Sequence, residues 1–161
     1  MLGVISNSDG RADRLADAVN VFKQAGATMV VHCGDVGGRH VLDAMSGDVV
    51  HGAFVWGDRD KDRMGLLRYG HSVGVDCLGL MGDLELEGKR IAVVHGNDRK
   101  LLRKLLDEQA HDYVLCGHEQ AVEDYTIGKT RVLNPGPLHG GKSASAMLLD
   151  PQSGKIKLVP L

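Results

Sequence analysis

Acidic and histidine side chains follow apolar runs at several separate places along the chain, and these residues are the ones that could do chemistry. Such a run, often with a glycine after it, precedes each of Asp35, Asp58, His95 and His118. Carboxylates and imidazoles gathered in one place repel one another or lie unpaired unless a cation fills the space between them. Divalent metals bind such mixed oxygen and nitrogen donors, and a bound divalent ion can generate hydroxide near neutral pH. The pattern therefore predicts a metal site.

These side chains meet only if the runs before them are strands, because open α/β sheets place ligands at the carboxyl ends of parallel strands. The strand-end candidates are Asn7, Asp9, Asp35, Asp58, Asp60, His95, His118 and Gln120. Taken singly they have plainer explanations, since Asp9 and Asp35 also stand where a residue would cap the following helix. Their repeated occurrence at strand ends favours one shared site.

Alternation and helical spacing predict strands and helices in turn through the first half, and mostly antiparallel strands in the second. The predicted strands are 2–5, 29–33, 49–56, 83–87, 89–94, 113–116, 122–127, 130–133, 146–149 and 156–159, and the predicted helices are 11–24, 36–45 and 98–109. This order predicts an α/β fold, a four-layer α-β-β-α sandwich of two packed mixed sheets. No linker or repeat divides the chain, so residues 1–161 are expected to form a single domain.

Composition limits the classes of function. The formal net charge of -2 argues against a protein that coats nucleic acid or lies on a membrane surface, because both usually need a basic face. No apolar run is long enough to span a membrane, and the apolar opening is too short for a signal peptide, so a cytoplasmic location is expected. Three widely spaced cysteines argue against a disulfide framework, and Cys33 and Cys116 are expected to be buried thiols.

Six short motifs carry the candidate residues. They are Asn7-Ser8-Asp9, Gly34-Asp35, Gly57-Asp58-Arg59-Asp60, His95-Gly96-Asn97, Gly117-His118-Glu119-Gln120 and Asn134-Pro135-Gly136-Pro137. In order and spacing they resemble the motifs of the calcineurin-like metallophosphoesterase family, specifically its small prokaryotic phosphodiesterase branch. The family pattern reads Asp-x-His, Gly-Asp, Gly-Asn-(His or Cys)-Asp, His-Gly-His, Gly-His-x-His and Asn-Pro-Gly-Ser. The resemblance covers nearly the whole chain and implies the sandwich fold of that family.

The resemblance implies two neighbouring metal ions that share Asp35 as a bridging ligand. The second metal position maps to Asp58, His95 and His118, where both family histidines are kept and a carboxylate replaces an amide. The complete ligand set is richer in oxygen than that of the family, and such sets favour Mg²⁺, Mn²⁺ or Ca²⁺ over zinc. We expect one strongly held divalent cation, Mn²⁺ or Mg²⁺, at these three residues and Asp35.

The first metal position maps to Asn7, Asp9 and Gln120, and all three side chains differ from those of the family. Asn7 and Asp58 look like a compensating exchange, in which a carboxylate moves from one metal position to the other. This position is therefore expected to bind a metal weakly or not at all.

The resemblance also implies catalytic and substrate-binding residues. Asp35, Arg59 and Asn97 are the expected catalytic residues, and Arg59, Asn97 and His139 the expected substrate contacts. Arginine is no general acid at ordinary pH, but it can pair with two phosphate oxygens at once. The plainer alternative for Arg59 is an ion pair with Asp60 or Asp62. His139 is included because its loop follows the Asn-Pro-Gly turn, although an ordinary solvated loop residue is the plainer explanation.

Three functions are consistent with these residues. The first is a metal-dependent phosphoesterase that hydrolyses phosphodiesters or other small phosphorylated substrates, and it is the expected one. The second is a catalytically impaired family member that serves as a binding scaffold, because five positions of the usual site are changed. The third is a domain without metal. Most replacements stay polar, as in Asp9, Asp58, Asn97 and Gln120, which argues against simple decay of the site. The sequence leaves a homo-oligomer open.

Overall fold

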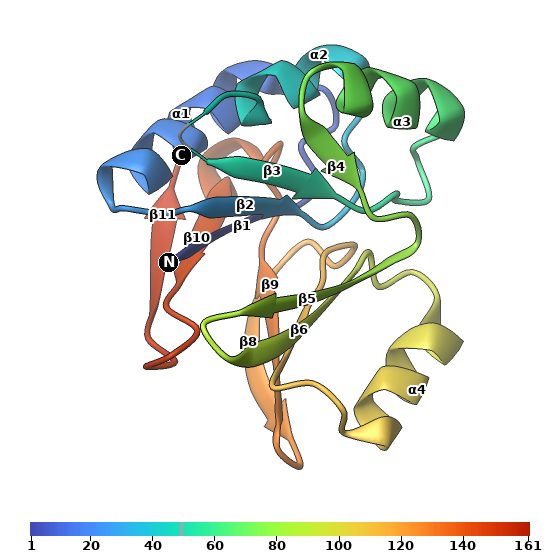
Figure 1. Ribbon diagram of the computed structural model, residues 1–161, viewed down its shortest axis with the longest axis vertical. Coiled ribbons are helices and arrows are strands. Elements are labelled where there is room, and N and C mark those ends of the chain that lie inside the picture. Colours follow the sequence, from blue (N-terminus) through green and yellow to red (C-terminus); the bar gives the residue numbers. More distant parts are fainter. Residues whose placement is uncertain (49) are drawn as a thin grey trace.

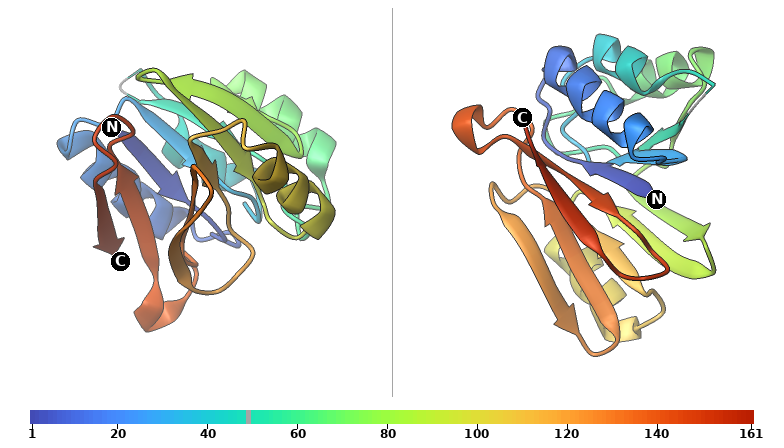
Figure 2. Two further views of the ribbon diagram at one scale, coloured as in Figure 1. Left: turned by 90° about the horizontal axis from the view of Figure 1, so that it is seen from below. Right: turned by 90° about the vertical axis from the view of Figure 1, so that its left-hand side faces the viewer.

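Two β-sheets pack face to face, with helices on their outer sides (Figures 1 and 2). The computed structural model describes residues 1–48 and 50–161. The strands are β1 (Leu2–Ile5), β2 (Met29–His32), β3 (His51–Phe54), β4 (Val75–Cys77), β5 (Met81–Leu86), β6 (Lys89–Val94), β7 (Tyr113–Leu115), β8 (Val122–Ile127), β9 (Thr130–Pro135), β10 (Ser145–Leu149) and β11 (Ile156–Pro160). The helices are α1 (Ala12–Gln24), α2 (Arg39–Leu42), α3 (Arg63–Ser72) and α4 (Arg99–Glu108). The sheet orders are β11-β10-β1-β2-β3-β4 and β5-β6-β7-β9-β8.

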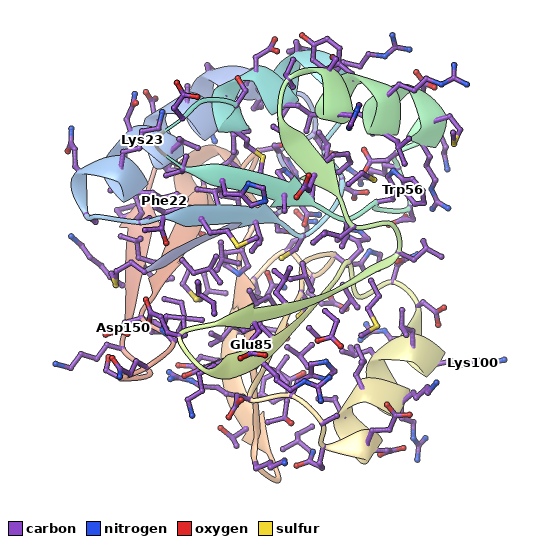
Figure 3. All side chains as sticks on the ribbon, viewed as in Figure 1. Phe22, Lys23, Trp56, Glu85, Lys100 and Asp150 are labelled. Carbon is purple, nitrogen blue, oxygen red and sulfur yellow. The ribbon has the colours of Figure 1, made fainter. Side chains whose placement is uncertain are left out.

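Three apolar cores separate four layers, which confirms the expected α-β-β-α sandwich. Along β2, Val30 packs toward the helices and Val31 toward the other sheet, because successive side chains of a strand point to opposite faces. Both faces are covered, and this explains the nearly continuous apolar runs in the sequence. Figure 3 shows Phe22 of α1 directed at the six-stranded sheet, while Lys100 of α4 points away from the protein.

Parallel strands bring distant loops to one edge of the sandwich. Strands β1, β2 and β3 are parallel in one sheet, and β6, β7 and β9 are parallel in the other. The second half of the chain is thus less antiparallel than the sequence predicts. Because parallel strands end at a common edge, the loops that follow these six strands all start from that edge.

Most differences from the expected elements lie between residues 36 and 77. The helix predicted over 36–45 begins only at Arg39 and continues as a 3₁₀ turn, η1 (Asp43–Met45), because Gly37 has a φ of 82° that no helix allows. The strand predicted over 49–56 is observed as β3, and Val49 lies outside the described residues.

Helix α3 and strand β4 are not expected from the sequence. Two interior glycines, Gly65 and Gly70, lower the helix propensity of α3. The Asp62 carboxylate nevertheless caps the helix by accepting from the Gly65 amide. A Cβ at Gly70 would lie 2.7 Å from the Val75 carbonyl oxygen, so a glycine allows this helix to lie close against β4. Tertiary packing outweighs local propensity here.

The expectations for cysteine and for membrane spans can be compared with the structure. All three cysteines are free thiols, and Cys33 and Cys116 are buried as expected. Burial raises the pKa of both thiols, that of Cys116 to about 12, so neither is a ready nucleophile. Across residues 1–48 and 50–161, no helix combines the length and the apolar character needed to cross a membrane.

Candidate metal centre

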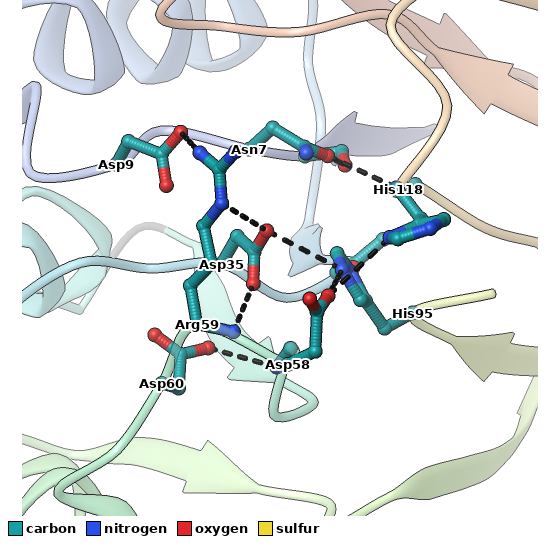
Figure 4. A network of polar contacts seen from close by, with 12 residues as sticks. Asn7, Asp9, Asp35, Asp58, Arg59, Asp60, His95 and His118 are labelled. Atoms are coloured by element: carbon teal, nitrogen blue, oxygen red, sulfur yellow. Dashed lines mark hydrogen bonds and ion pairs between the residues drawn. The ribbon is translucent and has the colours of Figure 1, made fainter. Parts of the chain in front are cut away.

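The loops that follow the parallel strands of both sheets deliver the candidate side chains to one place, as Figure 4 shows. The loops after β1, β2 and β3 carry Asp9, Asp35 and Asp58, and the loops after β6 and β7 carry His95 and His118. Neighbouring loops are joined by backbone hydrogen bonds, including those from the amides of Asn7, Asp9 and Gly117 to the carbonyl oxygens of Gly34, Asp35 and His95. The protein itself therefore holds the site together.

Backbone strain is concentrated at this site. Among the described residues, six other than glycine have a positive φ, and four of them are Asn7, Asp9, Asp35 and His118, with φ between 45° and 65°. Such conformations persist where the surrounding structure enforces them, and they cluster at functional sites. Asp9 and Asp35 do not cap the helices that follow, since the residues at those caps are Arg11 and Gly38. The capping explanation is therefore wrong for both acids.

Asp58, His95 and His118 form a compact group of possible metal ligands. One ligand atom from each lies within 4.8 Å of the other two. His95 Nε2 lies 2.9 Å from Asp58 Oδ1, and His118 Nδ1 lies 3.3 Å from the same oxygen. The Nδ1 of His95 bonds the Cys33 carbonyl oxygen at 2.7 Å, and because a carbonyl only accepts, Nδ1 carries hydrogen there. Nε2 is thereby directed at the carboxylates, as in histidines that bind metals.

Asp35 adds a second carboxylate beside His95. Its Oδ2 lies 3.4 Å from His95 Nε2, and its side chain is only 3 % exposed. Burial raises the pKa of Asp35, but bonds from His95 and from the Arg59 amide outweigh it, so the net pKa is lowered. Burial lowers the pKa of His95, yet the hydrogen bond to Asp35 and other polar neighbours raise it overall. The imidazole thus binds its proton more tightly than a free histidine does, and a cation that bound here would have to compete with that proton.

Two glycines allow this close packing. A Cβ at Gly57 would lie 2.0 Å from Asp35 Oδ1, and a Cβ at Gly34 would lie 2.7 Å from His95 Nδ1. Both separations are too short for any side chain. The glycines before Asp35 and Asp58 in the sequence are therefore required by the approach of neighbouring groups.

The other side of the site is arranged around Asp9. Its Oδ2 pairs with Arg59 Nη1 at 2.8 Å and lies 3.3 Å from His139 Nε2. The Nε of Arg59 lies 3.9 Å from Asp35 Oδ2. The expected alternative, in which Arg59 pairs with Asp60 or Asp62, is wrong. Asp60 bonds backbone amides, and Asp62 pairs with Arg39 at 2.6 Å.

Asn7 and Gln120 form hydrogen bonds that hold the loop of His118 in place. The Asn7 side-chain oxygen accepts from the Ser6 hydroxyl and, at 3.1 Å, from the His118 amide. The Gln120 amide group donates to the His118 carbonyl oxygen at 3.1 Å, and its oxygen lies 3.0 Å from His139 Nε2. The oxygens of both amides are thus engaged by protein groups.

Asn97 lies outside this network. It is exposed and lines a small cavity of about 110 Å³ beside His95, together with Trp56 and Leu101. Of the expected site residues, Asn97 is the one that contacts the metal ligands least directly.

Three positioning residues were not foreseen in their actual roles. Asp60 is buried and accepts from the amides of Val36, Gly37 and Gly57, which joins the loops after β2 and β3. The Asn134 amide group donates to the carbonyl oxygens of Gly117 and Glu119 on either side of His118. Arg14 of α1 donates to the carbonyl oxygens of Leu138 and Gly141 and so fixes the His139 loop. Asp60 and Asn134 stand in the quoted motifs, but nothing in the sequence separates Arg14 from a solvated helix charge.

The donor set fits a divalent cation on the Asp58 side. One carboxylate and two imidazoles converge there, a mix of oxygen and nitrogen ligands that divalent ions such as Mn²⁺ accept, and Asp35 lies next to them. On the Asp9 side a guanidinium already contacts the carboxylate.

The family of the chain follows from direct comparison. Residues 1–154 match the Calcineurin-like phosphoesterase superfamily domain. The chain belongs to this family. The match confirms the resemblance seen in the motifs and places the calcineurin-like phosphoesterase chain among the hydrolases, with a divalent metal and small phosphorylated substrates implied by the family.

Relatives of known type agree with the family. A phosphodiesterase of Methanocaldococcus jannaschii is 20% identical over 142 residues, which are 86% of this chain and 84% of that protein. The solved structure of an archaeal phosphodiesterase superposes with a TM-score of 0.85 at 19% identity and covers 99% of both chains. The Yfce phosphoesterase from E. coli gives a TM-score of 0.68 at 21% identity over 99% of this chain and 98% of its own. At these identities the solved structures establish the shared fold.

Proposed function

We propose that this calcineurin-like phosphoesterase is a metal-dependent phosphodiesterase with one strongly held cation, bound by Asp35, Asp58, His95 and His118. The observation that carries the proposal is the convergence of ligand atoms from Asp58, His95 and His118 within 4.8 Å of one another. Two carboxylates and two imidazoles make a mixed oxygen and nitrogen set, and carboxylates are ligands that Mn²⁺ and Mg²⁺ prefer. When bound, such an ion supplies positive charge to the phosphoryl oxygens and lowers the pKa of water toward neutrality.

The protein groups around this position suit a phosphorylated substrate. The Arg59 guanidinium is 62 % exposed and faces the same side of the site as Asp35. It lines a cavity of about 310 Å³ together with two further cations, Arg39 and Lys61, and two acids, Asp60 and Asp62, so the lining has an excess of one positive charge. Guanidinium groups bind phosphate oxygens in pairs, which both orients the ester and neutralises charge that develops on it. Arg59 is therefore assigned to substrate binding and to catalysis.

Two further residues complete the proposed substrate site. His139 lies beside Asp9 and Gln120, where its ring can contact a phosphoryl oxygen held by Arg59. Asn97 lies next to His95 on the opposite side and can donate a hydrogen bond to the alcohol part of an ester. Asp35 acts by orienting His95 and by neutralising the cation.

The test is hydrolysis of a chromogenic phosphodiester with Mn²⁺, Mg²⁺, Ni²⁺ or Ca²⁺ added to metal-free protein. Activity should appear with Mn²⁺ or Mg²⁺ and fall by roughly a hundredfold or more in Asp35→Ala and His95→Ala, because loss of even an outer contact to a metal ligand costs up to about that much. His51→Ala and Asp107→Ala are matched controls, since both side chains are exposed and neither lies in a loop that carries the site. Full activity in His95→Ala would refute the proposal.

The binding scaffold gives a different result in the same experiment. A scaffold that has kept its metal would melt at a higher temperature with Mn²⁺ but would hydrolyse none of the esters tested. The engagement of Asn7 and Gln120 by protein groups is the observation that favours this second function.

A further inference from the structure

We propose that the guanidinium of Arg59 takes the place of the other metal ion of the family, so that this chain works with one divalent cation and one built-in cation. The inference rests on the proposed function for the cation on the Asp58 side. It concerns the Asp9 side of the site, where the family pattern has no arginine.

The position of the guanidinium carries the argument. It lies between two carboxylates, with Nη1 2.8 Å from Asp9 Oδ2 and Nε 3.9 Å from Asp35 Oδ2 (Figure 4). The same Asp35 oxygen lies 3.4 Å from His95 Nε2 on its other side. Asp35 therefore has the guanidinium on one side and the cluster of Asp58, His95 and His118 on the other, as a carboxylate shared by two cations would have.

The main chain directs Arg59 to this place. Its backbone amide donates to Asp35 Oδ1 at 3.0 Å, which ties the start of the side chain to the carboxylate that its guanidinium approaches. The buried Asp60 carboxylate, next in sequence, holds the amides of Gly37 and Gly57 and so fixes the turn. The contact with Asp9 thus starts from a fixed point on the backbone, although the side chain itself is largely exposed.

With Arg59 in place, the groups on this side offer little to a metal. The Asn7 oxygen accepts from Ser6 and from the His118 amide, and the Gln120 oxygen is engaged by His139. Asp9 faces the position besides Asp35, and its Oδ2 contacts both Arg59 and His139. A metal ion here would have to displace a guanidinium from a charge-assisted hydrogen bond.

Charge leads to the same conclusion. The site has three carboxylates, those of Asp9, Asp35 and Asp58, and one divalent cation together with the guanidinium neutralises them. A second divalent cation in the presence of Arg59 would leave two positive charges without partners, which is costly in a half-buried site. Removal of the guanidinium would leave Asp9 and one side of Asp35 without a cation, and carboxylates so placed are ligands for Mn²⁺.

The experiment counts Mn²⁺ ions per chain by equilibrium dialysis and elemental mass spectrometry, with no substrate present. We expect one ion in the wild type and two in Arg59→Ala. Because both ions would then share Asp35, the signal of isolated Mn²⁺ in electron paramagnetic resonance should weaken in that variant. Arg39→Ala is the matched control, since Arg39 lines the same cavity but pairs with Asp62. The double variant Arg59→Ala/Asp9→Ala should return to one ion.

The difference between variants separates this inference from the proposed function. A count that is the same in wild type and Arg59→Ala overturns the role of Arg59, and so does a wild type that already binds two ions. A wild type that binds none contradicts the proposed metal site, yet a gain of one ion in Arg59→Ala would still support the role of Arg59. A gain of an ion in Arg39→Ala as well would show that any lost positive charge suffices, and would also overturn the inference.

Discussion

His32 is a buried histidine beneath the site, and its hydrogen bonds define its protonation. The Ser8 hydroxyl donates to the Val36 carbonyl oxygen, so the 2.8 Å contact between Ser8 Oγ and His32 Nε2 requires a hydrogen on Nε2. The Nδ1 atom then lacks hydrogen, and it has no hydrogen-bond partner among the described residues. Protonation of Nδ1 would place a buried positive N–H where the structure offers no acceptor. His32 is therefore neutral.

This neutral histidine predicts a loss of stability in mild acid. Burial is the main cause that lowers the pKa of His32 to about 4. Smaller effects come from Asp60 and Asp35, which raise this pKa, and from His95, which lowers it. In the unfolded chain the pKa is about 6.5, so the unfolded state takes up the proton first and stability falls from about pH 6.5 toward pH 4. The full effect is about 3 kcal/mol.

Urea denaturation of metal-free protein between pH 7 and pH 4 measures this effect. In His32→Gln, which can keep the contact with Ser8, the fall in unfolding free energy over this range should be smaller by most of that amount. Equal pH profiles of the two proteins would show that His32 is not the group responsible.

Single residues also show what sequence reasoning reaches. The types and order of Asp35, Asp58, His95 and His118 were enough to predict that they converge, because each follows a strand. The partner of Arg59 was not predictable. Asp60 and Asp62 are close in sequence, whereas Asp9 becomes its neighbour only through the pairing of β1 with β2 and of β2 with β3.

The loops between elements depend on a few buried polar contacts, and Asp60 provides three of them. Its two carboxylate oxygens accept three backbone hydrogen bonds, at 3.2 Å from Val36, 3.1 Å from Gly37 and 2.8 Å from Gly57. These bonds connect the loop after β2 to the loop after β3. The side chain is thus a structural link between the loops that carry Asp35 and Asp58.

Removal of this link should be costly. In Asp60→Ala the three amides lose their acceptor, and because each unsatisfied buried group costs about 1–3 kcal/mol, the unfolding free energy should fall by about 3 kcal/mol or more. Asp60→Asn keeps one carbonyl oxygen and should lose less. Chemical denaturation measures both. Asp62→Ala, which removes the exposed cap of α3 and an exposed ion pair with Arg39, should cost about 1 kcal/mol. An Asp60→Ala variant no less stable than Asp62→Ala would contradict this account.

At the scale of elements, the sequence predicted those with a strong periodic pattern. Helix α1 was predictable from Leu15, Ala18, Val19 and Phe22, which repeat on one face. Helix α3 was not, because it buries only Leu66 and Gly70 and contains two glycines. Its presence is decided by contact with β4 and α2, which no local pattern contains.

The whole molecule divides the site between its two sheets. The carboxylates and Arg59 come from loops of the six-stranded sheet, His95 and His118 come from loops of the five-stranded sheet, and His139 lies in the connection between the two sheets. Because the sheets are joined by an apolar core, the strands alone bring these two sets together. A core shared by both sheets is also what a single domain requires. The single domain over residues 1–161 remains a prediction, which a single cooperative unfolding transition would support.

A ligand that binds only the folded protein should raise its melting temperature. At a Mn²⁺ concentration about one hundred times the dissociation constant, the gain is about 2.7 kcal/mol, or roughly 5–10 °C for a protein of this size. Differential scanning calorimetry with Mn²⁺ or with chelator measures the shift. It should be absent in His118→Ala and unchanged in His51→Ala. A full shift in His118→Ala would place the ion elsewhere.

The division of the site between the sheets has a mechanical consequence. An ion bonded to Asp58 on one side and to His95 and His118 on the other would fasten the two sheets together, in addition to the apolar core and to polar contacts such as the one between His95 and the Cys33 carbonyl oxygen. Metal bonds are directional, so they would resist sliding of one sheet against the other. A hydrophobic contact resists such sliding poorly because it has no preferred direction. A change that loosens the interface between the two sheets should therefore also weaken binding of the ion. A partner that pressed on either sheet would alter the geometry of the metal site.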